Sequence, residues 1–160
     1  MTNETMHLSE VFDKSCERHR GGTVLRVSDG KSLKDVSYGR LHADVCLWAS
    51  FLQGRGVKAG DRVAAISAKS DNFRFFYACW RIGAIAVPVC ESLGNEEMSF
   101  VLKDCEPTLV LASETYLKKA QENAGGIPVV EWGTLPLAAE EDASKPFEAA
   151  PGPGTRPLRR

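Results

Sequence analysis

The sequence lacks long apolar runs, a strong net charge and a leader-like start. No apolar stretch approaches the roughly 18 residues that a membrane-spanning helix needs. The first residues, Met-Thr-Asn-Glu-Thr-Met-His, do not have the basic and then apolar pattern of a secretory signal. The 20 Lys and Arg residues nearly balance the 21 Asp and Glu residues, giving a formal net charge of −1. Bulk electrostatics therefore argue against a nucleic acid or an anionic membrane as the partner.

The cysteines show no paired spacing. Five are present, an odd number, and none belongs to a Cys-x-x-Cys motif. Four of the five lie among apolar residues at expected helix or strand positions, which is typical of small buried side chains in a reducing compartment. We therefore expect a cytoplasmic protein, with no membrane span and no nucleic-acid partner.

The second half of the chain alternates short apolar runs with helical periodicity. With 160 residues, of which 43% are hydrophobic and 26% charged, the chain is long enough for one globular domain. Buried strands are expected at residues 63–67, 84–89, 108–112 and 127–132. Helices are expected at residues 71–82, from Asn95 as N-cap to a stop at Pro107, and at residues 114–123. This order predicts an α/β fold with a parallel, helix-flanked sheet.

The first half has a different pattern. An amphipathic helix is expected over residues 7–20, followed by a small antiparallel ribbon of residues 23–28 and 32–37 around an Asp29-Gly30 turn. Ser37 is a plausible N-cap for a long helix that Gly54 and Gly56 end. Pro88 is expected at a strand end or at an edge strand, because it has no amide donor.

Few residues form a pattern that implies chemistry. Gly54, Gly56 and Gly60 have the wrong spacing for a dinucleotide fingerprint, and they follow a helix rather than a strand, so a helix-exit turn is expected. His42 and Cys46 are four residues apart on a helix but have no third ligand, and His42 is expected on a solvated side beside Asp44.

The loops that follow two strands are the remaining candidates. Residues 67–71 and 90–94 are expected at the carboxyl edge of the sheet, where open α/β sheets bind ligands, but ordinary strand-to-helix connections, with Asp71 and Asn95 as caps, are the favoured interpretation. Cys90 is not expected to be a nucleophile, because neighbouring Glu91 disfavours its thiolate. Glu96 and Glu97 suit a helix N-terminus, and the arginines 156, 159 and 160 are too few for an anion-binding prediction. We assign no catalytic, cofactor-binding or metal-binding residue.

Four ordered segments carry a resemblance to a known family. They are Ser37-Tyr38-Gly39-Arg40-Leu41 and residues 56–65, 81–89 and 97–113. Together they resemble the N-terminal part of adenylate-forming (AMP-binding) acyl-CoA synthetases and ligases, and the segment Leu-Lys-Asp-Cys-Glu-Pro is similar to the fatty-acid type. The resemblance implies an incomplete N-terminal subdomain of the adenylate-forming enzyme fold.

The family's chemistry would be carried by residues that this sequence does not contain. The resemblance implies that a full-length relative uses ATP, Mg and coenzyme A to convert a carboxylate to an acyl-adenylate and then to an acyl-CoA. The resemblance further implies that a Ser/Thr/Gly-rich loop handles Mg and the phosphates in such a relative, but no Thr-Ser-Gly-Thr-Thr-Gly segment occurs here. The chain is therefore expected to be a truncated fragment, inactive alone, with no cofactor of its own, and whether it should be called an enzyme stays open.

The same resemblance suggests boundaries and partners. Residues 1–142 are expected to form the partial subdomain and residues 143–160 a disordered tail, with a frameshift or premature stop near codon 154. An incomplete fold should expose apolar surface, including the helix side of Phe75, Cys79 and Ile82. That surface would favour self-association or docking of a complementary synthetase portion. The alternative function is a non-catalytic binding or regulatory module that associates with a separately encoded synthetase portion.

Overall fold

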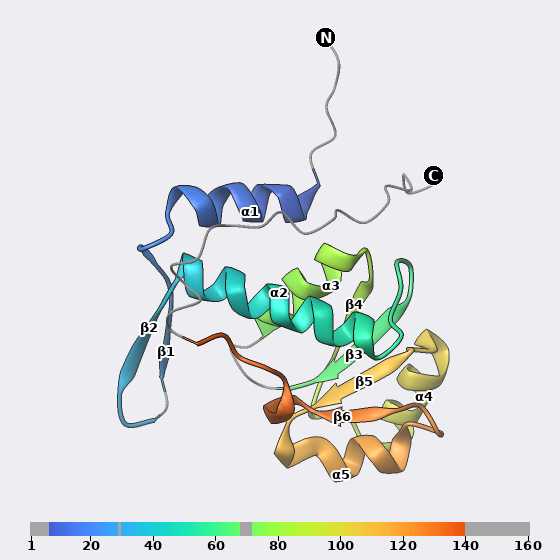
Figure 1. The fold of residues 1–160 in the computed structure, drawn as a ribbon. Coiled ribbons are helices and arrows are strands. Elements are labelled where there is room, and N and C mark those ends of the chain that lie inside the picture. The colour runs from blue at the N-terminus through green and yellow to red at the C-terminus, as the bar shows by residue number, and fades with distance from the viewer. Residues whose placement is uncertain (1–6, 29, 68–71, 140–160) are drawn as a thin grey trace.

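The computed structural model describes residues 7–28, 30–67 and 72–139. It contains a two-stranded antiparallel sheet and a four-stranded sheet with the order β4-β3-β5-β6, whose strand pairs are all parallel (Figure 1). The helices are α1 (Leu8–Arg18), α2 (Tyr38–Gly54), α3 (Asn72–Ile82), α4 (Asn95–Cys105) and α5 (Glu114–Asn123). The strands are β1 (Thr23–Ser28), β2 (Leu33–Ser37), β3 (Arg62–Ile66), β4 (Ile85–Val89), β5 (Leu109–Ala112) and β6 (Val129–Glu131), with the short 3-10 helix η1 at Trp132–Thr134. The α/β fold class, the parallel sheet and the N-terminal ribbon are confirmed.

The parallel sheet is buried on both faces, which explains its continuous apolar runs. Successive side chains of a strand point to opposite faces. Val63 of β3 therefore packs with Phe75 and Trp48 from α3 and α2, whereas Ile66 packs with Met98 and Leu102 from α4. Figure 1 shows α2 and α3 on one side of the sheet and α4 and α5 on the other. This sandwich requires strands without polar alternation, as the sequence has.

Local signals account for most element ends. The Ser37 hydroxyl accepts a hydrogen bond from the Arg40 amide at 3.1 Å and caps α2 as predicted. Gly56, just beyond the end of α2, has a φ of 87°, which favours glycine. The helix α4 differs from the prediction: Gly94 is its N-cap, and Asn95 is its first residue. The Gly94 amide donates to the Glu97 carboxylate at 2.8 Å, so Glu97 takes over the capping role expected of Asn95.

The strand β4 forms one edge of the sheet, and Pro88 lies in it as predicted. The Ile85 amide donates to the carbonyl of Asp61, which immediately precedes β3. Because the backbone groups of successive residues in a strand point in opposite directions, those of Ala86 and Pro88 point away from β3. Proline has no amide hydrogen, so Pro88 removes one donor from the open edge and limits its pairing with further strands.

The exposed apolar side chains are not where the sequence indicated. Phe75, Cys79 and Ile82 are buried, because this side of α3 packs on the sheet and the Phe75 ring lies 5.8 Å from the Trp132 ring. The expectation that this side is exposed was wrong. The large apolar side chains that are exposed in the described part of the chain are Leu8, Val11, Leu33, Leu47, Phe73, Trp80, Ile85, Phe100 and Leu137. Among the described residues, no helix has the length and apolar character needed to cross a membrane.

We predict that Phe75→Ala lowers the free energy of unfolding by about 3–5 kcal/mol, because it leaves a cavity in the core between α3 and the sheet. Phe100 is a matched control, since its side chain is 70% exposed on α4. Phe100→Ala should change the free energy of unfolding by about 0.5 kcal/mol or less. Urea denaturation followed by circular dichroism measures both, and equal effects would contradict the described orientation of α3.

Candidate functional site

The carboxyl edge of the parallel sheet brings together the loops that the sequence singled out. Ser67 follows β3, Cys90 follows β4 and Ser113 follows β5. Ser67 and Ser113 are buried, and Cys90 is exposed with its sulfur 3.1 Å from the Ser92 hydroxyl. Residues 68–71, including the proposed cap Asp71, lie outside the described part of the chain. Topology thus places Ser67 and residues 90–94 at the same edge, as predicted for these residues.

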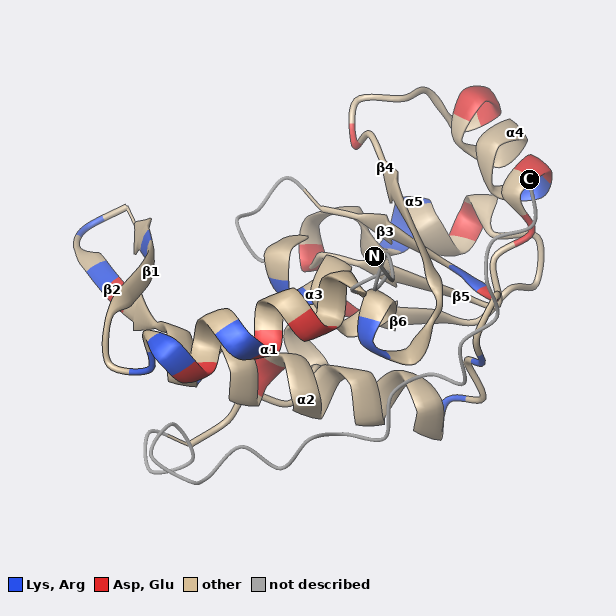
Figure 2. Ribbon diagram, turned by 90° about the horizontal axis from the view of Figure 1, so that it is seen from above, with Lys and Arg blue, Asp and Glu red and all other residues tan. Residues whose placement is uncertain are grey.

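The helix N-termini at this edge are poor phosphate sites. A phosphate would need free amides and the positive end of a helix dipole. At α4, the Gly94 amide is already bound to Glu97, and Glu96 adds a second carboxylate in the first turn. At α5, Glu114 occupies the first turn. Figure 2 shows the acidic residues on α4. Because these carboxylates repel phosphate, the described residues of this edge do not fit the nucleotide that AMP-binding chemistry requires.

The loop after β4 is held in place by α5. The Lys119 ammonium donates to the Glu91 carbonyl at 3.5 Å and also to the Leu93 carbonyl. The Lys119 ammonium, which could otherwise have bound an anion, is therefore bound to backbone carbonyls. The loop acts as an ordinary strand-to-helix connection.

The glycines between α2 and β3 form a turn, as expected. Gly56 and Gly60 both have a φ of 87°, which L side chains rarely adopt. The Gly60 amide donates to the Gly83 carbonyl at 2.8 Å, so the turn is tied to the end of α3. The backbone of this segment therefore positions β3 and the start of β4.

A partly buried ionic cluster joins α1, α2 and α3. One carboxylate oxygen of Asp13 lies 3.1 Å from His42 Nε2 and 2.5 Å from Arg81 Nη1. His42 is only 6% exposed, so its expected place on the solvated side of α2 was wrong. Cys46 Sγ lies 3.8 Å from His42 Nδ1, but the nearby Arg81 guanidinium would repel a metal ion. Within the described ranges, no group of three His, Cys, Asp or Glu side chains could hold a metal ion.

The cluster changes the acidity of its members. Burial acts to raise the pKa of Asp13, but hydrogen bonds from His42 and Arg81 outweigh it and lower that pKa below its ordinary value. Burial raises the pKa of the Cys16 thiol to about 12, and Asp13 adds to this effect. Burial likewise raises the pKa of Cys46. These thiols are therefore poor nucleophiles, as expected for structural cysteines.

A second cluster surrounds Asp44, which is completely buried. Its Oδ1 accepts from Arg40 Nε at 3.2 Å and from the Ala138 amide at 2.8 Å, and its Oδ2 accepts from Arg74 Nε at 2.8 Å. The sequence indicated that Asp44 lies on the wet side of α2, which was wrong. The available signal was the presence of two arginines, 74 and 81, within the otherwise apolar helix α3. Buried arginines need carboxylate partners, and α1 and α2 supply them.

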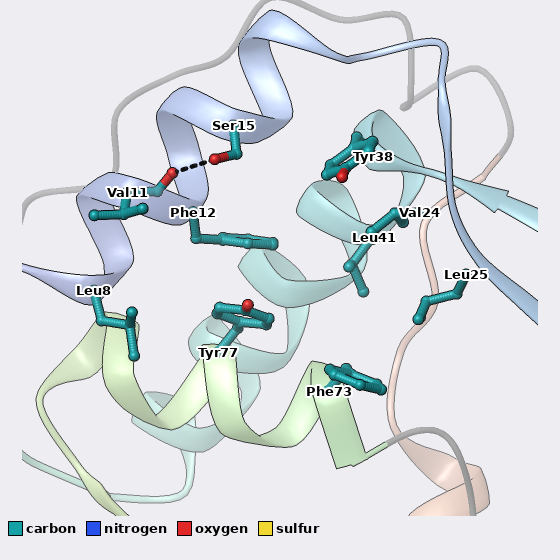
Figure 3. Close-up of a pocket in the computed structure, with 10 residues that line it drawn as sticks. All are labelled: Leu8, Val11, Phe12, Ser15, Val24, Leu25, Tyr38, Leu41, Phe73 and Tyr77. Atoms are coloured by element: carbon teal, nitrogen blue, oxygen red, sulfur yellow. Dashed lines mark hydrogen bonds between the residues drawn. The ribbon is translucent and has the colours of Figure 1, made fainter.

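An apolar cavity of about 320 Å³ lies between α1, β1, α2 and α3. The labelled side chains of Figure 3 form its walls: Leu8, Val11, Phe12, Ser15, Val24, Leu25, Tyr38, Leu41, Phe73 and Tyr77. The rings of Phe12 and Tyr77 stack with centroids 4.0 Å apart. The Ser15 hydroxyl donates to the Val11 carbonyl at 2.8 Å. The sequence analysis did not indicate this cavity, because its walls come from four elements that are far apart in the chain.

Comparison with known proteins identifies the family. A sequence model of the AMP-binding enzyme family matches residues 12–157, so the chain belongs to that family. The crotonobetaine/carnitine–CoA ligase of Proteus mirabilis is 28% identical over 113 residues, which make up 68% of this chain and 20% of the relative. The acetyl-coenzyme A synthetase of Brucella anthropi is 32% identical over 129 residues, covering 76% of this chain and 19% of the relative. The chain thus spans about a fifth of the length of these curated relatives.

Solved structures show the same fold inside longer chains. A fatty acyl-adenylate ligase from L. pneumophila matches 89% of this chain and 26% of its own, with a TM-score of 0.71 and 22% identity. A Rhodopseudomonas palustris protein described as a long-chain-fatty-acid CoA ligase matches 92% of this chain and 39% of its own, with a TM-score of 0.72 and 27% identity. The described fold is therefore one part of a larger adenylate-forming enzyme architecture.

We predict that Asp44→Ala lowers the free energy of unfolding by about 3–5 kcal/mol, because it removes the buried carboxylate that pairs with Arg74 and accepts from the Ala138 amide. Asp35 is the matched control, since its pair with Arg26, at 2.5 Å, lies on the surface. Asp35→Ala should have a much smaller effect, because water screens a surface ion pair. Chemical denaturation of the two variants measures the difference, and a small effect at Asp44 would contradict the structural role of that carboxylate.

We also predict an acid-dependent contribution from Asp13. Because its pKa is lowered in the folded state, Asp13 stabilises the fold above the ordinary aspartate pKa of about 3.9 and loses this effect as the pH falls through the lowered value. The stability difference between the wild type and Asp13→Asn should therefore be largest near neutral pH and shrink below about pH 4. Urea midpoints measured across this range test it. A difference that stays constant with pH would show that Asp13 is not ionised in the cluster.

Proposed function

We propose that this chain is the N-terminal portion of an ATP-dependent acyl-CoA ligase and that it does not catalyse adenylation alone. The observation that carries the proposal is the match to the AMP-binding family over residues 12–157 together with coverage of only about a fifth of the relatives. Residues 1–142 would form the partial subdomain, and residues 143–160 would lie outside it. A cytoplasmic location and a role in fatty acid metabolism are part of the proposal.

The physical argument for inactivity is the lack of charge-stabilising groups among the described residues at the carboxyl edge of the sheet. Adenylation places developing negative charge on phosphate oxygens, which needs amide donors, cationic side chains or a metal ion. The carboxyl edge instead presents Glu96, Glu97 and Glu114 in the first turns of its helices. In a full-length relative, ATP, Mg and coenzyme A would be bound by residues outside the segments that match this chain.

A second candidate is a non-catalytic module that associates with a separately encoded synthetase portion. The observation that favours it is the exposure of Leu8, Val11 and Phe73 around the cavity. Exposed apolar side chains gathered at one place are typical of an interaction surface. Both candidates share the same fold and the same family.

We predict that the purified chain does not exchange labelled pyrophosphate into ATP in the presence of Mg and either acetate or a long-chain fatty acid. Circular dichroism and a cooperative melting transition should show that the chain is folded under assay conditions. A full-length acyl-CoA ligase measured in parallel is the positive control. Carboxylate-dependent exchange by this chain above the level without protein would contradict the proposal.

A further inference from the structure

The cavity between α1, β1, α2 and α3, here called the α1–α3 cavity, opens between exposed apolar side chains. Leu8 and Val11 of α1 are 51% and 41% exposed, and Phe73 of α3 is 49% exposed. The stacked rings of Phe12 and Tyr77 form part of its wall (Figure 3). Its volume of about 320 Å³ is small for a site that binds a drug-sized molecule. The space suits one aromatic side chain better than a large ligand.

Residues 140–160 of this chain begin beside the cavity. The Asp44 carboxylate accepts from the Ala138 amide and from Arg74 Nε, at 2.8 Å in both cases. Arg74 is the neighbour of Phe73 in α3, so this carboxylate holds residue 138 close to the Phe73 end of the cavity. In the view of Figure 3, the faint orange end of the described chain runs past Phe73. The remaining residues therefore continue from a fixed point near the opening.

The charges at this point complement the residues that follow it. Arg40 Nε also binds Asp44, at 3.2 Å, so the guanidinium groups of Arg40 and Arg74 meet at one carboxylate. The chain continues after Ala139 with the acidic run Glu140-Glu141-Asp142. Opposite charges attract more strongly near a protein surface than in bulk water. The acidic run therefore begins at a corner that favours carboxylates.

The segment that follows the acidic run carries a suitable ring. Phe147 and Leu158 are the two large apolar residues of residues 140–160, and Phe147 comes nine positions after Ala138. Nine extended residues span about 30 Å, whereas the 11 residues of α3 are only about 16 Å long. Phe147 can therefore reach any part of the cavity. Pro146 restricts the backbone beside Phe147 and lowers the entropy cost of ordering its ring.

We propose that residues 140–147 of this chain fold back across α1 and α3 as a strap that closes the α1–α3 cavity. The acidic run lies at Arg40 and Arg74, and the Phe147 ring occupies the cavity beside Phe73. Both parts of the strap meet a matching surface, because its charged part lies at the basic corner and its aromatic part contacts apolar walls.

This inference goes beyond the proposed function, because it needs neither adenylation nor a second protein. It places residues 143–147 on the surface of the subdomain, where the sequence predicted a disordered tail. The strap covers the apolar surface that a separately encoded synthetase portion would use. Such a partner would have to displace Phe147 before it could bind there, so the strap acts as an intramolecular competitor.

Photo-cross-linking of the full chain locates the strap directly. The photoreactive residue p-benzoylphenylalanine replaces Phe147 in one protein and, as the matched control, Leu158 in another. After irradiation and proteolysis, mass spectrometry identifies the linked peptides. The label at 147 should link within the same chain to peptides that contain residues 8–12 or 73–77, and the label at 158 should not.

Two sets of variants of the protein labelled at 147 test the two parts of the strap. Phe73→Glu should lower the yield of this cross-link about tenfold, because it places a charge in an apolar cavity. Phe100→Glu is its matched control on α4, where Phe100 is 70% exposed, and it should leave the yield unchanged. The changes Glu140→Lys, Glu141→Lys and Asp142→Lys, made together, should lower the yield about threefold and leave the described core intact. Circular dichroism shows whether each variant folds.

Cross-links from 147 that scatter over other surfaces, or that match those from 158, would overturn the inference. So would a yield that Phe73→Glu and the charge reversal both leave unchanged. Cross-links between two chains, seen as a covalent dimer, would assign the cavity to a second copy and would also overturn it. Pyrophosphate exchange by the chain would contradict the proposed function without changing the cross-link pattern, so the two failures are distinguishable.

Discussion

The buried carboxylate of Asp44 is the interaction on which the arrangement of the helices depends. It lies on α2, accepts from Arg74 of α3 and accepts from the amide of Ala138 at the end of the described chain. Without this carboxylate, a buried guanidinium would lose an ion pair and a buried backbone amide would lose its acceptor, which is costly inside a protein. The Asp13 cluster repeats the principle between α1, α2 and α3. Together the two clusters fix the helix layer above the sheet.

The sequence predicted elements that depend on local pattern and missed contacts that depend on distant partners. The Val63 and Leu109 runs indicated buried parallel strands, and Ser37 indicated the start of α2, because periodicity and capping are visible within a few residues. The burial of Asp44 could not be predicted in this way, since two of its three partners, Arg74 and Ala138, are 30 and 94 positions away. For a related reason, the sequence did not predict which side of α3 packs on the sheet. Both of its faces are apolar, and only the packed sheet distinguishes Phe75 from Phe73.

The candidate site shows what this part of an AMP-binding enzyme does and does not contribute. The carboxyl edge of the sheet is well formed, yet Glu97 occupies the amide that a phosphate would use at α4. The described N-terminus of α4 therefore has no free amide for a phosphate at Gly94. The described residues also have an exposed apolar surface around Phe73 and Leu8, on the side of α3 that faces away from the sheet. A scaffold with one unpaired apolar face is consistent with a piece of a larger folded unit.

The most direct test of this account is to sequence the DNA that follows codon 160 in the source genome and to translate it in all three forward frames. The account predicts that one frame encodes the rest of an AMP-binding enzyme, including a Ser/Thr/Gly-rich phosphate loop. A downstream region with no such sequence in any frame would contradict the central claim that this chain is the front portion of an acyl-CoA ligase.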